Sequence, residues 1–318
     1  MLPLFDEISA DLAVVDRELH KALQSNDPLL TETANHLLKA GGKRLRPAFA
    51  LLAGKFHRYD LTAVLPLAMA LELIHMATLV HDDVVDAAQT RRGTPTVKAL
   101  WGNRVSTHTG DFLLARALIL VSEYPNEMIP RELARACVLM AEGELLQMAG
   151  TNRPDLRQYL KRIKGKTAVL IEAACKLGAV ATGAPPSIYR PLGRYGYQLG
   201  MAFQITDDIL DMLADERRLG KPVGGDLRQG VITLPVIYAL ERSPEAGTLT
   251  AIVAHPEKTP EDIREAIRIT RDCGGIDFAF QVAERYLAKA RAQLERLPAI
   301  PARETLARIA EFVRARSF

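Results

Sequence analysis

The sequence predicts an all-α protein: a single domain, built as a bundle of long helices around a central apolar cavity. Apolar residues recur at three- and four-residue spacing along most of the 318 residues, whereas alternating β-type patterns are scarce. A content of 48% apolar residues is ample for a large buried core. Because no low-complexity linker or fixed-period repeat divides the chain, we expect residues 1–318 to form one domain.

The individual helices follow from this spacing and from local start and stop signals. Proline is accepted in the first turn of a helix, and glycine caps a helix end with positive φ. In chain order, helices are expected at 2–24, 27–38, 47–56, 61–87, 97–100, 109–123, 130–148, 155–181, 191–214, 234–242, 261–273, 276–297 and 301–316. Loops are expected at 89–95 and, rich in glycine, at 220–230.

The segment 61–80 is apolar nearly all the way round, which is typical of a helix at the centre of a bundle. It is the longest candidate for a membrane span, but Pro66, Glu72 and His75 interrupt it short of the ~18 apolar residues that a bilayer requires. The first residues mix acids with apolar side chains and lack the basic start of a signal peptide. We therefore expect a soluble, cytoplasmic protein without a transmembrane segment.

Composition argues against two other classes of protein. The formal net charge is only +3, which gives no overall sign of a nucleic-acid binder. The cysteines, Cys137, Cys175 and Cys273, are isolated in the sequence. We expect them to be small buried residues and not parts of a disulfide framework or a zinc site.

Two acidic triplets of the form DDxxD occur at 82–86 and 207–211, each after an apolar helical stretch. Carboxylates one helical turn apart repel each other, and the apolar surroundings add a desolvation cost. Mg²⁺ offsets both, because it prefers oxygen ligands and completes its shell with phosphate oxygens and water. Two such helices facing each other across an apolar cavity would suit a ligand with a diphosphate head and an apolar tail.

Cationic residues that could bind diphosphates occur at three places: after the glycines at 41–42, after the first triplet, and at 166 within an expected helix. The candidates are Lys43, Arg46, Arg91, Arg92 and Lys166. Arg44 and the basic run 153–164 are expected to be solvated surface. His75 lies two turns before Asp82 on nearly the same helical face, so it is a candidate for a substrate contact.

Taken together, the motifs resemble those of the trans-prenyl (polyprenyl) diphosphate synthases, whose fold is the all-helical isoprenoid synthase fold. The matching segments are GGKRLRP at 41–47, ELIHMATLVHDDVVD at 72–86, RRG at 91–93, GDFLLA at 110–115, GKT at 165–167, FQITDDILD at 203–211 and GKPVGGDLRQG at 220–230. The stretch 72–104 is most similar to the catalytic subunit of bacterial heptaprenyl diphosphate synthases. One departure is Val231, where many members carry Lys or Asn.

The resemblance implies Mg²⁺ as the cofactor, bridged by the allylic diphosphate. Its implied ligands are Asp82, Asp83, Asp86, Asp207, Asp208 and Asp211. Implied contacts to the allylic diphosphate are Arg91, Lys166, Thr167, Gln204 and Lys221. Implied contacts to isopentenyl diphosphate are Lys43, Arg46, His75 and Arg92. The expected catalytic residues are Asp82, Asp83, Asp86, Asp207, Asp208 and Lys166.

Product length is expected to depend on the residues five and four positions before the first acid. In the resembled family, bulky residues there stop short products, whereas this chain has the small Ala77 and Thr78. Helical geometry puts Thr78 on the face of Asp82, while the inclusion of Ala77 rests on the resemblance. From Pro66 to Asp82 a helix rises by roughly 24 Å, which is deep enough for a product well beyond farnesyl. We expect heptaprenyl (C35) product, with hexaprenyl (C30) next.

The sequence is compatible with more than one assembly state and with several alternative functions. The resemblance implies a homodimer, or a heterodimer with a small regulatory subunit, with no nucleic acid and at most peripheral membrane contact for product release. It also implies a role in isoprenoid synthesis, with the menaquinone side chain as the expected use. The alternatives are a homodimeric geranylgeranyl or octaprenyl diphosphate synthase, a terpene cyclase, and a non-catalytic subunit of a heteromeric synthase. The double set of basic motifs argues against the cyclase, and the six intact aspartates argue against the non-catalytic subunit.

Overall fold

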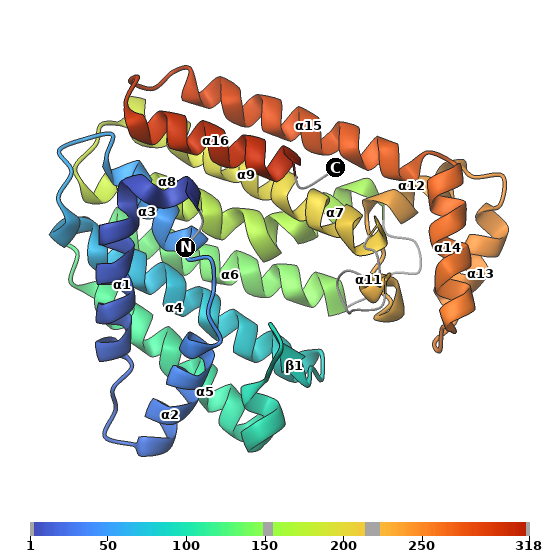
Figure 1. Ribbon diagram of the computed structural model, residues 1–318, viewed down its shortest axis with the longest axis horizontal. Coiled ribbons are helices and arrows are strands. Elements are labelled where there is room, and N and C mark those ends of the chain that lie inside the picture. The colour runs from blue at the N-terminus through green and yellow to red at the C-terminus, as the bar shows by residue number, and fades with distance from the viewer. Residues whose placement is uncertain (1–2, 149–154, 214–222, 316–318) are drawn as a thin grey trace. The chain divides into compact units, whose positions relative to one another are not determined.

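The computed structural model describes residues 3–148, 155–213 and 223–315 (Figure 1). Within these ranges nearly all regular structure is helical, which confirms the all-α prediction. The helices are η1 (Pro3–Ile8), α1 (Ser9–Ala22), α2 (Pro28–Lys39), α3 (Leu45–Gly54), α4 (Leu61–Val85), α5 (Val97–Ser122), α6 (Met128–Met148), α7 (Leu156–Ile163), the π-helical turn η2 (Lys164–Ala168), α8 (Val169–Ala181), α9 (Pro186–Leu213), α11 (Gly225–Arg228), α12 (Leu234–Arg242), α13 (Ala246–Ala254), α14 (Pro260–Asp272), α15 (Gly275–Leu294) and α16 (Pro301–Ala315).

The chain divides into two compact units, and α6, α8, α9 and α16 contribute residues to both. The first unit comprises Met1–Cys137, Ala173–Gly193 and Leu297–Leu306. The second comprises Val138–Glu172, Arg194–Arg296 and Ala307–Phe318. The expectation that residues 1–318 form a single domain stays a prediction.

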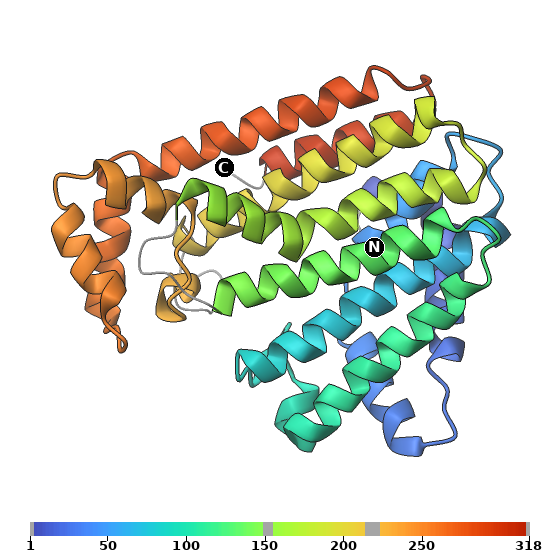
Figure 2. The ribbon, with the colours of Figure 1, turned by 180° about the vertical axis from the view of Figure 1, so that it is seen from behind.

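In the first unit, α4 packs along α5 (Figure 2). It also contacts α1 and α3. These neighbours explain its composition, because most of its side chains from Val64 to Val80 are buried. Among the described helices, α4 is the one long and apolar enough to cross a bilayer, yet 67% of its apolar window is buried inside the protein. That burial is typical of a helix in the core of a bundle.

Pro66 lies inside α4, and the hydroxyl of Tyr124 fills the gap beside it in the helical hydrogen bonds. This hydroxyl donates to the carbonyl of Ala63 at 2.6 Å and accepts from the amide of Leu67 at 3.1 Å. In an unbroken helix these two backbone groups would bond to each other. The start of α4 is thus held by a residue of the turn that follows α5.

Several elements differ from the sequence-based expectation. α5 runs from Val97 to Ser122 with a kink at Gly102, whose φ of 82° is not helical, so the break expected at 101–108 is present but shorter, and the chain is helical again from residue 103. Packing on α4 and a buried hydrogen bond of 2.9 Å from Thr109 to Thr33 of α2 support the weak helix formers in that segment. α13 was not expected, because its run of Thr, Ile and Val has low helix propensity. It forms where it packs on α12 and α14.

In the second unit, α12 contacts α7, α13, α14 and α15 around one apolar cluster. The last turns of α9 contribute Ile205, Ile209 and Met212 to this cluster. Because these three residues are spaced to lie on one face of α9, that face packs into the core and the opposite face is turned away from it. The neighbouring face carries Gln204 and Asp208 at the same spacing, and these two residues line a cavity.

Candidate active site

The first acidic triplet lies at the C-terminal end of α4, with Asp86 as the C-cap residue. Asp83 is buried, with 2% of its side chain exposed, and its Oδ1 accepts a hydrogen bond of 2.8 Å from Nε of Arg91. Nη2 of Arg91 lies 2.8 Å from the same oxygen. Negative charge at a helix C-terminus is unfavourable, so this cation offsets the local field.

A two-residue hairpin turn brings Arg91 to this position. Strands β1 (Thr90–Arg91) and β2 (Thr94–Pro95) pair antiparallel, with Arg91 opposite Thr94. The turn residues Arg92 and Gly93 have φ of 54° and 76°. Two positive φ values in sequence are characteristic of a type I′ turn, which matches the twist of a hairpin. The segment 89–95 was expected to be a loop, and this hairpin was not foreseen.

A cluster of cations surrounds one buried acid, Glu72 of α4, which is 3% exposed. Nη1 of Arg44 lies 2.8 Å from Glu72, and Nε of Arg44 lies 2.7 Å from Asp16 of α1. The side chain of Arg44 is only 12% exposed, so the expectation that it is solvated surface is wrong. Arg44 adopts a left-handed φ of 48°, and these two ion pairs hold it there, directly before α3.

The other members of this cluster show that positive charge is in excess. Burial lowers the pKa of Arg46 to about 10, with the charge of Glu72 acting in the opposite direction. Its Nε is buried and has no hydrogen-bond partner among the described residues. Burial, followed by the charges of the neighbouring arginines, lowers the pKa of His75 well below its ordinary value. Burial also lowers the pKa of Arg92. A bound anion would relieve this excess.

The remaining residues predicted in this unit are found at α4 and before α3. Ala77 is completely buried, whereas Thr78 is partly exposed and donates its hydroxyl to the carbonyl of His75 at 2.8 Å. Asp86 and Lys43 are exposed, and Asp82 is partly exposed. The roles of Ala77 and Thr78 in product length stay predictions.

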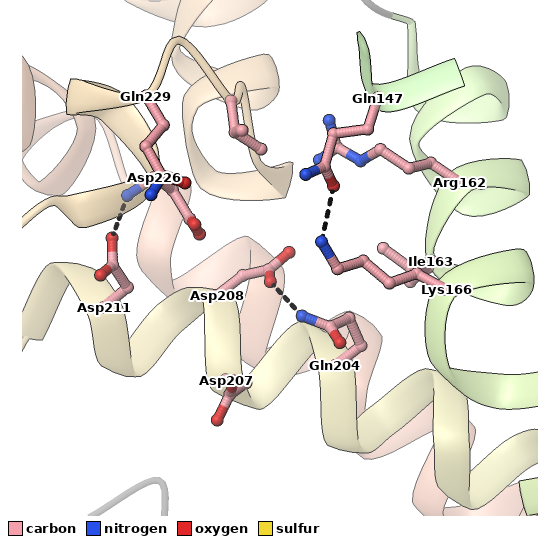
Figure 3. Close-up of a pocket in the computed structure, with 11 residues that line it drawn as sticks. Gln147, Arg162, Ile163, Lys166, Gln204, Asp207, Asp208, Asp211, Asp226 and Gln229 are labelled. Atoms are coloured by element: carbon pink, nitrogen blue, oxygen red, sulfur yellow. Dashed lines mark hydrogen bonds between the residues drawn. The ribbon is translucent and has the colours of Figure 1, made fainter. Parts of the chain in front are cut away.

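The second acidic triplet lines a cavity of about 260 Å³ in the second unit (Figure 3). Helix α9, the π-helical turn η2 and α7, the end of α6, and the segment around α11 all contribute to its wall. The lining residues are Gln147, Arg162, Ile163, Lys166, Gln204, Asp207, Asp208, Asp211, Asp226, Gln229 and Val231. The structure therefore brings together the predicted Lys166, Gln204 and second triplet.

A chain of hydrogen bonds fixes Asp208 in this cavity. The hydroxyl of Thr167 donates to Oε1 of Gln204 at 2.5 Å, and Nε2 of Gln204 donates to Oδ1 of Asp208 at 2.8 Å. The other oxygen, Oδ2, accepts from the hydroxyl of Tyr159 at 2.7 Å. The predicted Thr167 thus acts on the triplet through Gln204, and Tyr159 was missed by sequence reasoning because it reads as an ordinary core residue of α7.

Asp226 is a further carboxylate that sequence reasoning missed. Oδ1 and Oδ2 of Asp211 accept from the backbone amides of Gly225 and Asp226, both at 3.1 Å. The side chain of Asp226 lines the cavity beside the triplet (Figure 3). An acid directly after Gly224 and Gly225, in a loop already expected to be glycine-rich, was the available signal. Asp211 thereby anchors the segment that presents Asp226.

Lys166 lies in η2, where the helix makes a π-helical turn between α7 and α8. Single π turns of this kind are common at functional sites. A Cβ on Gly165 would lie 3.0 Å from Cα of Gly143 and 2.5 Å from the carbonyl oxygen of Leu139, so glycine is required for this close approach to α6. Nζ of Lys166 donates to Gln147 at 3.1 Å and lies 3.8 Å from Glu144.

The basic run before Lys166 differs from the expectation at one position. Arg157, Lys161 and Lys164 are exposed, as expected for solvated surface. Arg162 instead lines the cavity and donates from Nη2 to the carbonyl of Ile232 at 2.9 Å. Lys221 and Arg153 lie outside the described residues.

The acids of the cavity carry an excess of negative charge. Burial raises the pKa of Asp208 to about 6. Burial, followed by the charges of Asp208 and Asp211, raises the pKa of Asp226 to about 7. In the part of the chain that the structure describes, no three His, Cys, Asp or Glu side chains converge into a complete metal cage. A cation that takes few protein carboxylates and fills its shell with phosphate and water, as Mg²⁺ does, fits such a donor set.

Sequence comparison assigns this chain to a family. The family profile described as polyprenyl synthetase matches residues 27–270. The chain belongs to the polyprenyl synthetase family. It is 44% identical to heptaprenyl diphosphate synthase component 2 of Bacillus subtilis over 313 residues, 98% of this chain and 89% of that protein. It is 45% identical to the protein of the same name from Geobacillus stearothermophilus, over 99% of this chain and 98% of that protein.

Solved structures agree with this assignment. A decaprenyl diphosphate synthase from Rhodobacter capsulatus superposes with a TM-score of 0.94 at 35% identity, over 99% of this chain and 98% of that one. A polyprenyl synthase from Caulobacter crescentus, complexed with calcium and isoprenyl diphosphate, gives a TM-score of 0.92 at 38% identity, over 99% and 97% of the two chains. The predicted isoprenoid synthase fold and the predicted trans-prenyltransferase class are thus confirmed for this polyprenyl synthetase.

Proposed function

We propose that this polyprenyl synthetase condenses isopentenyl diphosphate with farnesyl or geranylgeranyl diphosphate, in the presence of Mg²⁺, to form an all-trans polyprenyl diphosphate. The observation that carries the proposal is the cavity of the second unit, in which the acids of one triplet and the cation of Lys166 line a common wall. Excess negative charge on the acids favours divalent metal, and Lys166 favours the diphosphate that the metal bridges.

The proposed ligands of Mg²⁺ are the aspartates of the two triplets. They are Asp82, Asp83, Asp86, Asp207, Asp208 and Asp211. Asp226, which lines the same cavity as the second triplet, joins this set as a further acid. When bound, Mg²⁺ would supply charge neutralisation for the departing diphosphate. Arg91, Lys166, Thr167, Gln204 and Lys221 are the proposed contacts to the allylic diphosphate.

Isopentenyl diphosphate is proposed to bind at the cationic cluster of the first unit. Lys43, Arg46, His75 and Arg92 are its proposed contacts, and the excess positive charge there supports this assignment. The low pKa of His75 keeps its ring neutral, so it would act as a hydrogen-bonding group. In the reaction, the allylic C–O bond breaks, the isopentenyl double bond forms the new C–C bond, and a proton leaves to the departing diphosphate.

Heptaprenyl (C35) is the proposed product, with hexaprenyl (C30) next. Small side chains at Ala77 and Thr78 support a long product. Octaprenyl and geranylgeranyl products are the alternatives within the same chemistry, and an octaprenyl diphosphate synthase of Escherichia coli is 36% identical over 96% of each chain. We further propose that the protein is cytoplasmic and that its product serves as a menaquinone side chain.

A partner subunit is proposed because helices α5 and α6 expose large apolar side chains. Leu118 and Ile119 of α5 are 59% and 54% exposed, and Leu145 and Met148 of α6 are 64% and 59% exposed. Exposed apolar residues in such numbers are typical of subunit interfaces. The partner is a second copy of the chain or a small regulatory subunit, and the relatives named component 2 support the latter.

The test is product analysis with the purified chain. Isopentenyl diphosphate is supplied with farnesyl or geranylgeranyl diphosphate, with Mg²⁺ or with EDTA, and products are sized by liquid chromatography with mass spectrometry. We expect Mg²⁺-dependent C35 product that is lost in Asp207→Asn and kept in Asp277→Asn, which changes an exposed aspartate of α15. Absence of diphosphate release under all conditions would instead support a non-catalytic subunit. C35 product from the purified chain alone would rule out an obligatory partner, and size-exclusion chromatography with light scattering determines whether the active chain is a homodimer.

A further inference from the structure

Tyr159 is buried in the core of the second unit, yet its hydroxyl bonds to an acid that lines the cavity. Only 1% of the residue is exposed, and the other buried members of its cluster are apolar. The hydroxyl donates to Oδ2 of Asp208 at 2.7 Å. A phenylalanine would fill the same space, so packing alone does not account for a hydroxyl that must be desolvated.

The ring that carries this hydroxyl is held from a second direction. Arg162, one turn later on α7, lies with its guanidinium carbon 5.4 Å from the ring centroid of Tyr159. That guanidinium is itself fixed by its hydrogen bond of 2.9 Å to the carbonyl of Ile232. The phenol therefore has a fixed orientation before any ligand binds.

With Tyr159 in place, both oxygens of Asp208 hold a hydrogen-bond donor. Gln204 donates to Oδ1 at 2.8 Å, and the hydroxyl of Thr167 fixes the amide of Gln204. Rotation of the carboxylate would break one of two hydrogen bonds inside a site where Asp208 is only 5% exposed. Each carboxylate oxygen keeps a further lone pair, so the acid can still meet a cation.

We propose that Tyr159 is a positioning residue, which orients the Asp208 carboxylate so that the cavity is preset for a divalent cation and a diphosphate. Groups that hydrogen-bond to a metal-binding side chain fix the direction of its lone pairs. Their loss typically lowers metal affinity by about 10–100-fold. The proposal rests on the proposed function, because that function takes Asp208 as a metal ligand.

The test compares Tyr159→Phe with Tyr197→Phe in the full-length protein. Tyr197 is a half-buried tyrosine of α9 in the same unit, whose hydroxyl bonds to Tyr286, so both variants lose one phenolic hydrogen bond. Mn²⁺ binding in the presence of inorganic pyrophosphate is measured by electron paramagnetic resonance, without any turnover. The Mg²⁺ concentration for half-maximal activity and the thermal midpoint are measured in parallel.

We expect Tyr159→Phe to weaken Mn²⁺ binding and to raise the half-maximal Mg²⁺ concentration, each by on the order of tenfold. Tyr197→Phe should leave both unchanged while shifting the thermal midpoint by a similar amount. In an Asp208→Asn background, Tyr159→Phe should have no further effect on Mn²⁺ binding. Unchanged Mn²⁺ affinity in Tyr159→Phe, or equal losses in both backgrounds, would overturn the proposal. If the unaltered protein binds no Mn²⁺ with pyrophosphate, the proposed function fails first.

Discussion

Nε of Arg91 donates to Oδ1 of Asp83 at 2.8 Å, and Nη2 of the same arginine lies 2.8 Å from that oxygen. One predicted metal ligand is thus paired with one predicted diphosphate contact. Asp83 is 2% exposed and Arg91 is 29% exposed, so the acid depends on the arginine for its compensating charge. The pair joins the end of α4 to the hairpin that follows it.

Removal of the Arg91 side chain should therefore leave the buried Asp83 carboxylate without a compensating positive charge. We expect Arg91→Ala to lower the free energy of unfolding by about 1–3 kcal/mol. Adding Asp83→Asn should recover most of that loss, since a neutral amide is less costly to bury. Urea unfolding measures both effects, with Arg104→Ala, an exposed arginine of α5, as the control. A loss in Arg91→Ala no larger than in the control would contradict this assignment.

We expect the Glu72 carboxylate to stabilise the protein more when the anion site at the cationic cluster is empty than when an anion is bound there. Glu72→Gln removes the acid that compensates Arg44 and influences Arg46 and Arg92. We expect a lower thermal midpoint in buffer and a larger rise on adding inorganic pyrophosphate than in the unaltered protein, because the anion replaces the lost charge. Differential scanning fluorimetry measures both. An identical pyrophosphate shift in the two proteins would count against an anion site at this cluster.

The acids of the second unit predict a pH dependence with a definite sign. Asp226 and Asp208 have pKa values raised to about 7 and about 6, so between about pH 4 and pH 7 the folded protein binds more protons than the unfolded chain. Stability without metal should accordingly fall as pH rises through this window. Mg²⁺ with pyrophosphate should stabilise the protein more at pH 8 than at pH 5.5, since protons no longer compete.

The Asp226→Asn variant isolates this effect from other titrating groups. With EDTA, its thermal midpoint should fall less between pH 5.5 and pH 8 than that of the unaltered protein. Asp277→Asn, an exposed acid of the same unit, should keep the original slope. Parallel curves for Asp226→Asn and the unaltered protein would show that Asp226 does not titrate in this range.

Product length should respond to the size of residue 77. Ala77 is fully buried, so Ala77→Phe has to intrude on neighbouring space and is expected to shorten the main product below C35, with a stability loss of about 1–3 kcal/mol. Thr78→Val keeps the side-chain volume and removes the hydroxyl bonded to the carbonyl of His75, so its products should keep their length. Mass spectrometry of the products decides. Unchanged C35 from Ala77→Phe would reject this path for the tail.

Sequence alone carried the features that depend on local spacing. Helical periodicity predicted the all-α fold, and the apolar run before Asp82 predicted a buried α4, because burial on all sides requires apolar residues on all sides. The loop expected at 220–230 was less accurate, because the short helix α11 (Gly225–Arg228) lies inside it. Within the triplets, one-turn spacing was enough to indicate a site for hard cations.

Tertiary contacts decided what local spacing could not. The sequence predicted Arg44 to be at the surface. In the structure it pairs with Glu72 and Asp16, which are both 28 residues away in the chain. The sequence around Tyr159 indicates an ordinary core residue, but its hydroxyl donates a hydrogen bond to Asp208, 49 residues later in the chain. A side chain's partner is set by how helices pack, and a single sequence contains propensities and periodicities but not that packing. Residue types and their spacing were thus enough to indicate the enzyme family, whereas the hydrogen-bond and ion-pair partners of Arg44 and Asp208 emerged only from the tertiary structure.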